Sequence, residues 1–135
     1  MSDTGPAGRP TVMVCITCRA ATDLVSASDE SPRPGSALAD ATMLAAAGAN
    51  DISVLRVRCL GNCSRGPSAA IRCENTWTYI FGGLDPQRDG PSLITGAQLL
   101  AQATDGIMPW RGRPESLKRG LIARIPPLNF REEPL

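Results

Sequence analysis

The chain has 135 residues, the length of one domain, and its 42% hydrophobic content with a net charge of +1 excludes a wholly disordered protein. It contains five cysteines and no histidine, so histidine-dependent catalytic triads and imidazole metal sites are excluded within the chain. No apolar run approaches the ~18 residues that cross a membrane, and the polar start lacks the apolar stretch of a secretory signal, so we expect a cytoplasmic protein without membrane contact.

The first half of the chain predicts a strand, a helix and a second strand. Residues 1–10, which contain two glycines and two prolines, are expected to be a disordered leader. The β-prone run 11–14 ends at Cys15, and a loop rich in serine, aspartate and proline follows it. The alanine-rich stretch 36–48 then predicts a helix, and residues 51–57 predict the second strand.

The second half predicts a hairpin and another helix. The β-prone runs 68–72 and 76–81 are separated by three residues, which suit a hairpin turn. Residues 92–105 carry leucines spaced for one helical face. We therefore expect an α/β fold over 11–106, a small mixed four-stranded sheet made of a parallel βαβ unit and a β-hairpin with flanking helices. This order of elements is thioredoxin-like.

The C-terminal residues 107–135 are expected to form an irregular tail packed on the domain through Trp110 and 121–125. This tail holds six basic and three acidic residues, whereas the rest of the chain holds eight basic and ten acidic residues. The basic side chains that we expect to face outward and to steer an acidic partner are Arg111, Arg113, Lys118 and Arg119. In the competing interpretation the tail covers a sheet edge or a dimer surface, and the protein is a homodimer. The near-neutral domain with few aromatic residues argues against nucleic acid as a partner.

Four of the five cysteines form two close pairs, each at the end of a predicted strand. Cys15 and Cys18 form C-x-x-C, and Cys59 and Cys63 form C-x-x-x-C. The carboxyl ends of parallel strands lie at the same edge of a sheet, so the two pairs are expected to converge. Four converging thiolates suit tetrahedral zinc or an iron–sulfur cluster. Cys73 lies at the predicted hairpin turn, away from both loops, and is expected to be a buried residue and not a ligand.

Arginine and glycine residues beside the paired cysteines favour a cluster. A 2Fe–2S centre with four thiolates carries a charge of −2, and of −3 when reduced, so nearby positive charge and close backbone N–H groups stabilise the reduced form. The residues expected to supply these interactions are Arg19, Arg58, Gly61, Arg65 and Gly66. The competing interpretation of the arginines is solvated loop charge.

The second cysteine loop resembles one in a known group of proteins. Residues 59–71, Cys-Leu-Gly-Asn-Cys-Ser-Arg-Gly-Pro-Ser-Ala-Ala-Ile, are similar to the second cluster-binding loop of thioredoxin-like 2Fe–2S ferredoxins, C-x-G-x-C-x-x-G-P followed by a strand. Those ferredoxins carry another cysteine pair after their first strand, where this chain has Cys15 and Cys18. The resemblance implies that these two residues, with Cys59 and Cys63, hold one 2Fe–2S cluster.

Residues 11–127 as a whole resemble a bacterial family known mostly as predicted metal-binding proteins, itself similar to those ferredoxins. The resemblance lies in three segments, Val-Cys-Ile-Thr-Cys-Arg, Pro-Arg-Pro-Gly-Ser-Ala-Leu and Pro-Trp-Arg-Gly-Arg-Pro-Glu. That family is often associated with cobalamin biosynthesis, so the resemblance implies a role in that pathway.

The leading hypothesis is an electron carrier, not an enzyme, that passes single electrons to a larger partner protein. One alternative is a four-cysteine zinc-binding or metal-delivery module, although such zinc sites usually use C-x-x-C twice. The other is a thiol–disulfide oxidoreductase using Cys15 and Cys18, although a proline-rich loop follows Cys18 where a thioredoxin-type dithiol would start an activating helix.

Overall fold

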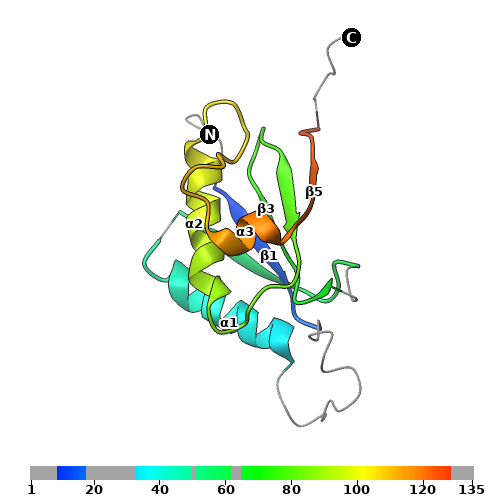
Figure 1. Cartoon of the computed structure of the whole chain (residues 1–135). Coiled ribbons are helices and arrows are strands. Elements are labelled where there is room, and N and C mark those ends of the chain that lie inside the picture. The colour runs from blue at the N-terminus through cyan, green and yellow to red at the C-terminus, as the bar shows by residue number, and fades with distance from the viewer. Residues whose placement is uncertain (1–8, 18–32, 50, 62–64, 129–135) are drawn as a thin grey trace.

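The computed structural model describes residues 9–17, 33–49, 51–61 and 65–128. All described strands belong to one five-stranded sheet with the order β2-β1-β3-β4-β5 (Figure 1). No helix in these ranges is long and apolar enough to cross a membrane. The elements in chain order are β1 (Thr11–Cys15), α1 (Pro34–Ala46), β2 (Ser53–Val57), β3 (Ala69–Arg72), β4 (Thr78–Phe81), α2 (Asp89–Gln102), α3 (Glu115–Arg119) and β5 (Leu121–Ile125).

The first three elements form the predicted βαβ unit. β1 pairs with β2 in parallel, with Thr11 opposite Ser53 at one end and Cys15 opposite Val57 at the other. β3 lies on the other side of β1 and pairs with it and with β4 in antiparallel fashion, which confirms the predicted hairpin. The carboxyl ends of β1 and β2 therefore lie at the same edge of the sheet. This is the arrangement predicted for the two strands that precede the cysteine pairs.

The sheet has five strands, and the prediction of four strands with an irregular tail was wrong on this point. Leu121–Ile125 form β5, which pairs antiparallel with β4 and has a register shift at Ile80/Phe81. Without β5 the outer edge of β4 would expose a row of unpaired N–H and C=O groups. The C-terminal stretch is thus an edge strand of the same sheet.

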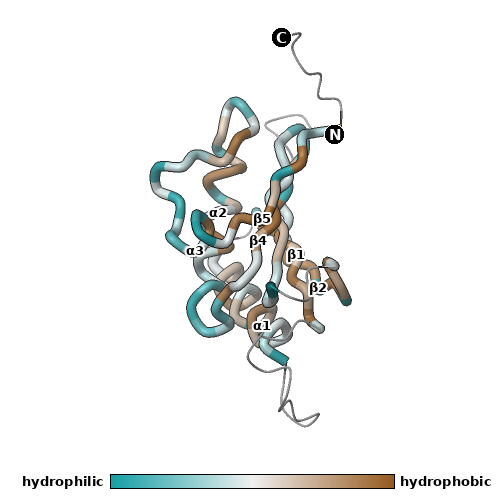
Figure 2. Tube along the Cα trace, turned by 45° about the vertical axis from the view of Figure 1, so that its right-hand side comes forward, coloured by the Kyte–Doolittle hydropathy of each residue, from teal (hydrophilic) through white to brown (hydrophobic). Residues whose placement is uncertain are grey.

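One face of the sheet is buried against the helices. Register places its core-facing side chains on the same face of β1, β3 and β4, and they pack with Leu38 of α1 and with Leu93 and Leu100 of α2. Figure 2 shows α2 and α3 on one side of the strands. The side chains of this buried face are Val12, Val14, Ala69, Ile71, Tyr79 and Phe81.

The two long helices begin earlier than the sequence pattern predicts. α1 starts at Pro34, because a proline fixes φ suitably for the first helical turn and its missing N–H would have no partner there. α2 starts at Asp89, whose carboxylate accepts a hydrogen bond of 2.6 Å from the backbone N–H of Asp85. The helices meet closely where Gly90 of α2 lies against the backbone of Ala41.

The C-terminal segment is anchored by the predicted stretch Leu121–Ile125, which pairs with β4, and by further residues that were not predicted. Trp110 is 60% exposed, whereas Met108 and Leu117 are fully buried. Arg113, expected to face outward, is only 8% exposed; its guanidinium donates a 2.6 Å hydrogen bond to the carbonyl of Met108 and stacks on the rings of Tyr79 and Trp110. Burial lowers the pKa of Arg113 below its ordinary value. The expectation that Arg113 faces outward was therefore wrong, because its planar cation is held by the Met108 carbonyl and lies over the rings of Tyr79 and Trp110. The expectation that Trp110 packs on the domain was also wrong, since most of its side chain is exposed.

Candidate metal centre

Cys15 is the last residue of β1 and is held in place by its main chain. Its backbone N–H donates a 3.0 Å hydrogen bond to the carbonyl of Ser68, and its partner across the ladder is Val57, the last residue of β2. The side chain is buried, and its thiol donates to the carbonyl of Arg58 at 3.5 Å. The two strand ends therefore bring the Cys15 sulfur beside the residue that precedes Cys59.

Cys59 lies two residues beyond β2 and is exposed. Its sulfur accepts a 3.2 Å hydrogen bond from the backbone N–H of Gly61. Gly61 has a φ of 77°, a conformation that favours glycine and that turns this N–H back toward the sulfur. Donation from a backbone N–H to a cysteine sulfur is one of the contacts by which proteins tune iron–sulfur ligands.

The second cysteine loop is tied at its far end to the connection between β4 and α2. The N–H of Gly83 donates to the carbonyl of Arg65 at 2.5 Å, and the N–H of Leu84 donates to the carbonyl of Pro67 at 3.1 Å. The Gly66–Pro67 peptide bond, directly before β3, is cis. Main-chain hydrogen bonds thus hold the far end of this loop to the β4–α2 connection.

Sequence reasoning missed Thr17 and Gly83. The Thr17 hydroxyl donates to the Arg58 carbonyl and lies 3.7 Å from the Cys15 sulfur, so it links the first cysteine loop to the second. Its position inside C-x-x-C was the one available signal. Gly83 follows the hairpin, and its hydrogen bond to Arg65 joins residues that are far apart in the sequence. No local sequence pattern could therefore have indicated its role.

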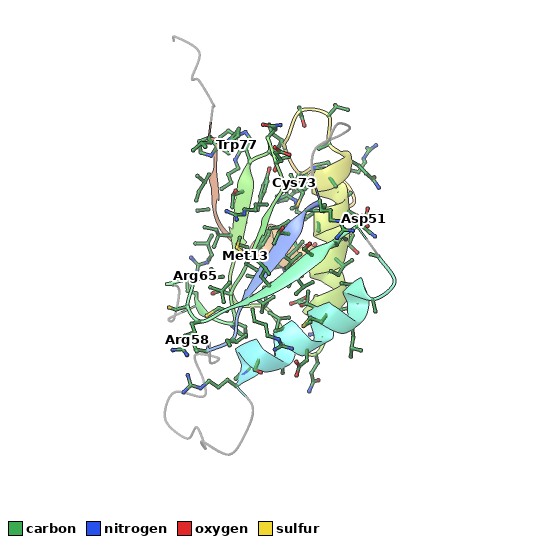
Figure 3. The ribbon with its side chains drawn as sticks, turned by 180° about the vertical axis from the view of Figure 1, so that it is seen from behind. Met13, Asp51, Arg58, Arg65, Cys73 and Trp77 are labelled. Carbon is green, nitrogen blue, oxygen red and sulfur yellow. The ribbon has the colours of Figure 1, made fainter. Side chains whose placement is uncertain are left out.

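The predicted charged residues lie at the expected end of the sheet. Arg58 and Arg65 are exposed and are found together at one end, while Cys73 and Trp77 lie at the other (Figure 3). Neither arginine forms an ion pair with a residue that the structure describes. Gly66, by contrast, is buried. The positive charge of both arginines is therefore available to a negatively charged group at this end.

Three of the predicted site residues, Cys18, Cys63 and Arg19, lie outside the described residues. Within the described ranges no three cysteine, aspartate or glutamate side chains gather as metal ligands. The structure places one cysteine from each predicted pair near the same edge of the sheet, with Cys15 at the end of β1 and Cys59 two residues beyond the end of β2. Two thiols so placed, with a backbone N–H directed at one of them, fit half of a four-thiolate site.

Cys73 lies far from this end of the sheet. It follows β3, whose last residue Arg72 is paired with Thr11 at the amino end of β1, whereas Cys15 is at the carboxyl end. The side chain is 7% exposed, and burial raises the pKa of the Cys73 thiol. These features match the expectation of a buried cysteine at the hairpin.

Alkylation of Cys73 by iodoacetamide should be much slower in the folded protein than in urea at neutral pH. The thiolate is the nucleophile, and burial both hides this sulfur and disfavours its ionised form. Peptide mass spectrometry on metal-free protein gives the rate at each cysteine, with the exposed Cys59 as the internal comparison. Equal rates for Cys73 in the folded and unfolded protein would contradict its burial.

A comparison with protein families finds one family whose model matches most of the chain. Residues 12–127 match the family described as "Protein of unknown function (DUF1636)", which accounts for most of the sequence. The chain belongs to the DUF1636 family. No curated protein matches this DUF1636 member.

Two solved structures from Aquifex aeolicus are similar to this DUF1636 protein, and both are of a thioredoxin-like [2Fe-2S] ferredoxin. The first has a TM-score of 0.56 at 16% identity and covers 92% of this chain and 100% of the ferredoxin. The second, the wild-type ferredoxin at 1.5 Å resolution, has a TM-score of 0.54 at 14% identity and covers 87% and 99%. At these identities the likeness establishes the fold, so the predicted thioredoxin-like α/β class is confirmed for this DUF1636 member.

Proposed function

We propose that this protein is a small electron carrier that binds one 2Fe–2S cluster through Cys15, Cys18, Cys59 and Cys63. The observation that carries the proposal is the position of Cys15 and Cys59 near the same edge of the sheet, at the end of β1 and just beyond the end of β2. Likeness to the fold of a 2Fe–2S ferredoxin supports it. When bound, the cluster would supply one-electron redox chemistry.

The remaining residues of the site have separate roles in this proposal. The main-chain hydrogen bonds of Cys15 and of the second loop keep the ligands in place, and the N–H of Gly61 donates to the Cys59 sulfur. Arg58 and Arg65 offset the negative charge that an added electron brings. In this proposal the protein is not an enzyme; it delivers electrons in the cytoplasm to a larger enzyme, one of cobalamin biosynthesis as the family resemblance implies.

The visible spectrum of anaerobically purified protein tests the proposal. We expect a brown protein with two iron and two sulfide per chain, whose visible absorption bleaches on reduction with dithionite. Iron, sulfide and zinc are measured on the same sample. A colourless protein with one zinc per chain would replace this proposal with the zinc module, and a metal-free protein after anaerobic preparation would contradict both.

The thiol–disulfide alternative has less support from the fold. A thioredoxin-type dithiol lowers its pKa through a helix that starts at the cysteine pair. Here α1 starts at Pro34, sixteen residues after Cys18. The described part of the first loop, Ile16 and Thr17, is a turn. Reduction of insulin disulfides by the metal-free protein at a rate above the free-dithiol background would support this alternative.

Neutralising the arginines beside the site should lower the reduction potential. In Arg58→Gln and Arg65→Gln, one positive charge near the cluster is lost, so the more negative reduced form is disfavoured. A tenfold change in a one-electron equilibrium corresponds to about 59 mV, and we expect shifts of roughly tens of millivolts for these exposed side chains. Anaerobic redox titration measures the potentials.

Arg72→Gln is the matched control for these two variants. Arg72 is also exposed, but it lies at the end of β3 beside Cys73, away from Cys15. Its loss should leave the potential nearly unchanged, since water and salt screen charge over that distance. Equal shifts in all three variants would mean that net charge, and not proximity to the site, sets the effect.

A further inference from the structure

A polar cavity of about 940 Å³ opens beside the far end of the second cysteine loop. Its walls come from Arg65 and Gly66 of that loop, from the β4–α2 connection with the start of α2, and from the segment 115–120 that contains α3. α3 lies beside α2 on the same side of the sheet in Figures 1 and 2. The volume is that of a small-molecule site. Neither Cys15 nor Cys59 lines the cavity, so it is separate from the candidate metal centre.

Glycine residues keep the cavity open, and main-chain hydrogen bonds fix its walls. Four of the lining residues are glycines, so backbone forms much of the surface. At Gly120 an added Cβ would lie 2.6 Å from the Ser116 carbonyl oxygen and 2.7 Å from that of Gly82. The N–H of Gly82 donates to the carbonyl of Gly120 at 2.8 Å, and the N–H of Gly120 donates to that of Ser116 at 2.9 Å. These contacts hold the β4–α2 connection and α3 at a fixed separation.

Three arginine side chains line the cavity and keep hydrogen-bond donors for a ligand. Among the described residues, Arg88 donates through Nε to Asp85 at 3.2 Å, and Arg119 donates through Nε to Glu115 at 3.1 Å. The terminal nitrogens of both, and the whole guanidinium of Arg65, have no partner in these ranges. Planar guanidinium groups bind phosphate and carboxylate oxygens with pairs of N–H donors. The arginines therefore suit an anionic group.

A buried hydroxyl without a partner supplies a further donor. Ser116 lines the cavity, and its Oγ is the one buried side-chain oxygen or nitrogen in the described part of the chain that has no hydrogen bond. Burying a hydroxyl in this state costs free energy. A serine hydroxyl is redirected by rotation about one bond, so a ligand oxygen in the cavity would give it the partner it lacks.

Three carboxylates also line the cavity, and they restrict what the anionic group can be attached to. They belong to Asp85, Asp89 and Glu115. Ionised carboxylates accept hydrogen bonds and cannot donate them, so they favour hydroxyl groups and repel a second anionic group. No aromatic side chain is among the lining residues that the structure describes, so a nucleotide base would have no ring to stack on.

We propose that this cavity binds the phosphate ester of a hydroxyl-rich small molecule such as a sugar. The phosphate group lies among Arg65, Arg88 and Arg119, and the hydroxyl groups donate to the carboxylates. A phosphate group has more acceptor oxygens than a carboxylate, which suits three guanidinium groups and the Ser116 hydroxyl. The cavity is much larger than a phosphate ion, which leaves room for the sugar. The proposal does not depend on a bound metal.

Isothermal titration calorimetry of the full-length protein at low ionic strength tests the proposal. The probes are glucose 6-phosphate, inorganic phosphate and glucose. We expect glucose 6-phosphate to bind about tenfold more tightly than inorganic phosphate, and glucose to give no measurable binding, because the phosphate and the hydroxyl groups both contribute. Equal affinities for glucose 6-phosphate and inorganic phosphate would overturn the proposal, as would tighter binding of glucose or no binding of any probe.

Arg88→Gln and Arg119→Gln should each weaken glucose 6-phosphate binding about tenfold, because each removes a charged set of donors. Both ion pairs are exposed, so their loss should leave the protein folded, which circular dichroism checks. Arg56→Gln is the matched control, since Arg56 also forms an exposed ion pair, with Asp40, but lies in β2 and does not line the cavity. An equal loss of affinity in Arg56→Gln would show that net charge alone is responsible and would overturn the proposal.

Ser116→Ala separates a role in binding from a role in folding. Alanine removes a hydroxyl that has no partner, so the free energy of unfolding measured in urea should stay the same or rise. The affinity for glucose 6-phosphate should fall several-fold, because one donor to the phosphate is lost. A variant that loses stability and keeps the parent affinity would contradict the proposed site.

Discussion

Alanine in place of Cys59 should abolish the visible absorption of the purified protein and leave it with little or no iron. The same result is expected for Cys15→Ala. Each substitution removes one of four thiolates, and the remaining set leaves an iron site open to water and to loss of the metal. Absorption, iron and sulfide per folded chain are the measurements, made on protein prepared without oxygen.

Cys73→Ala is the control that separates the loss of a cluster ligand from the loss of any cysteine. Its thiol lies at the opposite end of the sheet, so the variant should keep its colour and its iron. Removing a buried sulfur should lower the free energy of unfolding by about 1 kcal/mol, which circular dichroism detects separately from the metal content. A colourless Cys73→Ala beside a coloured Cys59→Ala would show that the ligand set is wrong.

Gly90→Ala should destabilise the fold, although alanine is the better helix former. A Cβ at this position would lie 2.6 Å from the carbonyl carbon and 2.8 Å from the carbonyl oxygen of Ala41. These are backbone atoms of α1, so the two helices must move apart. Alanine gains about 1 kcal/mol in helix propensity over glycine, but overpacking against backbone exceeds this gain, and we expect a net loss of about 1–3 kcal/mol.

Gly48→Ala provides the matched comparison for Gly90→Ala. Nothing lies within 4 Å of a Cβ added at Gly48, and its φ is not in the left-handed region. Restricting the unfolded chain should make this variant neutral or more stable by about 0.4–1 kcal/mol. Urea denaturation of both variants gives the free energies. A similar loss in both would mean that the close approach of α1 and α2 is not the cause.

Strong local signals account for the part of the fold that the sequence predicted. The apolar run before Cys15, the alanine-rich helix and the β3–β4 hairpin each carry their own pattern, and the structure confirms all three, although residues 73–77 make the hairpin connection five residues long and not three. The start of α1 was placed two residues late, because Pro34 was read as part of the loop and not as the first helical residue.

The missed features depend on contacts between distant parts of the chain. Leu121–Ile125 are five residues between a glycine and a proline, and only the open edge of β4 makes them a strand. Arg113 is buried because the Met108 carbonyl and two aromatic rings surround it, whereas charged residues are rarely buried without such partners. Neither environment can be read from a short window of sequence.

The candidate site also has one part that the sequence predicts and another that depends on contacts between distant segments. The spacing of the cysteine pairs and the parallel order of the first two strands predict that the pairs converge. The ladder ends with Cys15 opposite Val57, two residues before Cys59. The hydrogen bonds of Thr17 and Gly83 arise from the way the two loops and the β4–α2 connection come together. Hydrogen bonds of this kind, which support the cysteine loops, depend on the folded arrangement and have no sequence pattern of their own.

The position of β5 has a consequence for how the protein is made. Synthesis proceeds from the N-terminus, and domains begin to fold while the chain is still growing. Among the described strands β5 comes last along the chain, but it pairs with β4, which is complete about forty residues earlier. Until the ribosome releases the final segment, β4 presents an unpaired edge on an otherwise assembled sheet, the kind of edge to which other nascent chains add. Synonymous codons that slow translation after residue 106 should therefore lower the soluble yield without changing the finished protein.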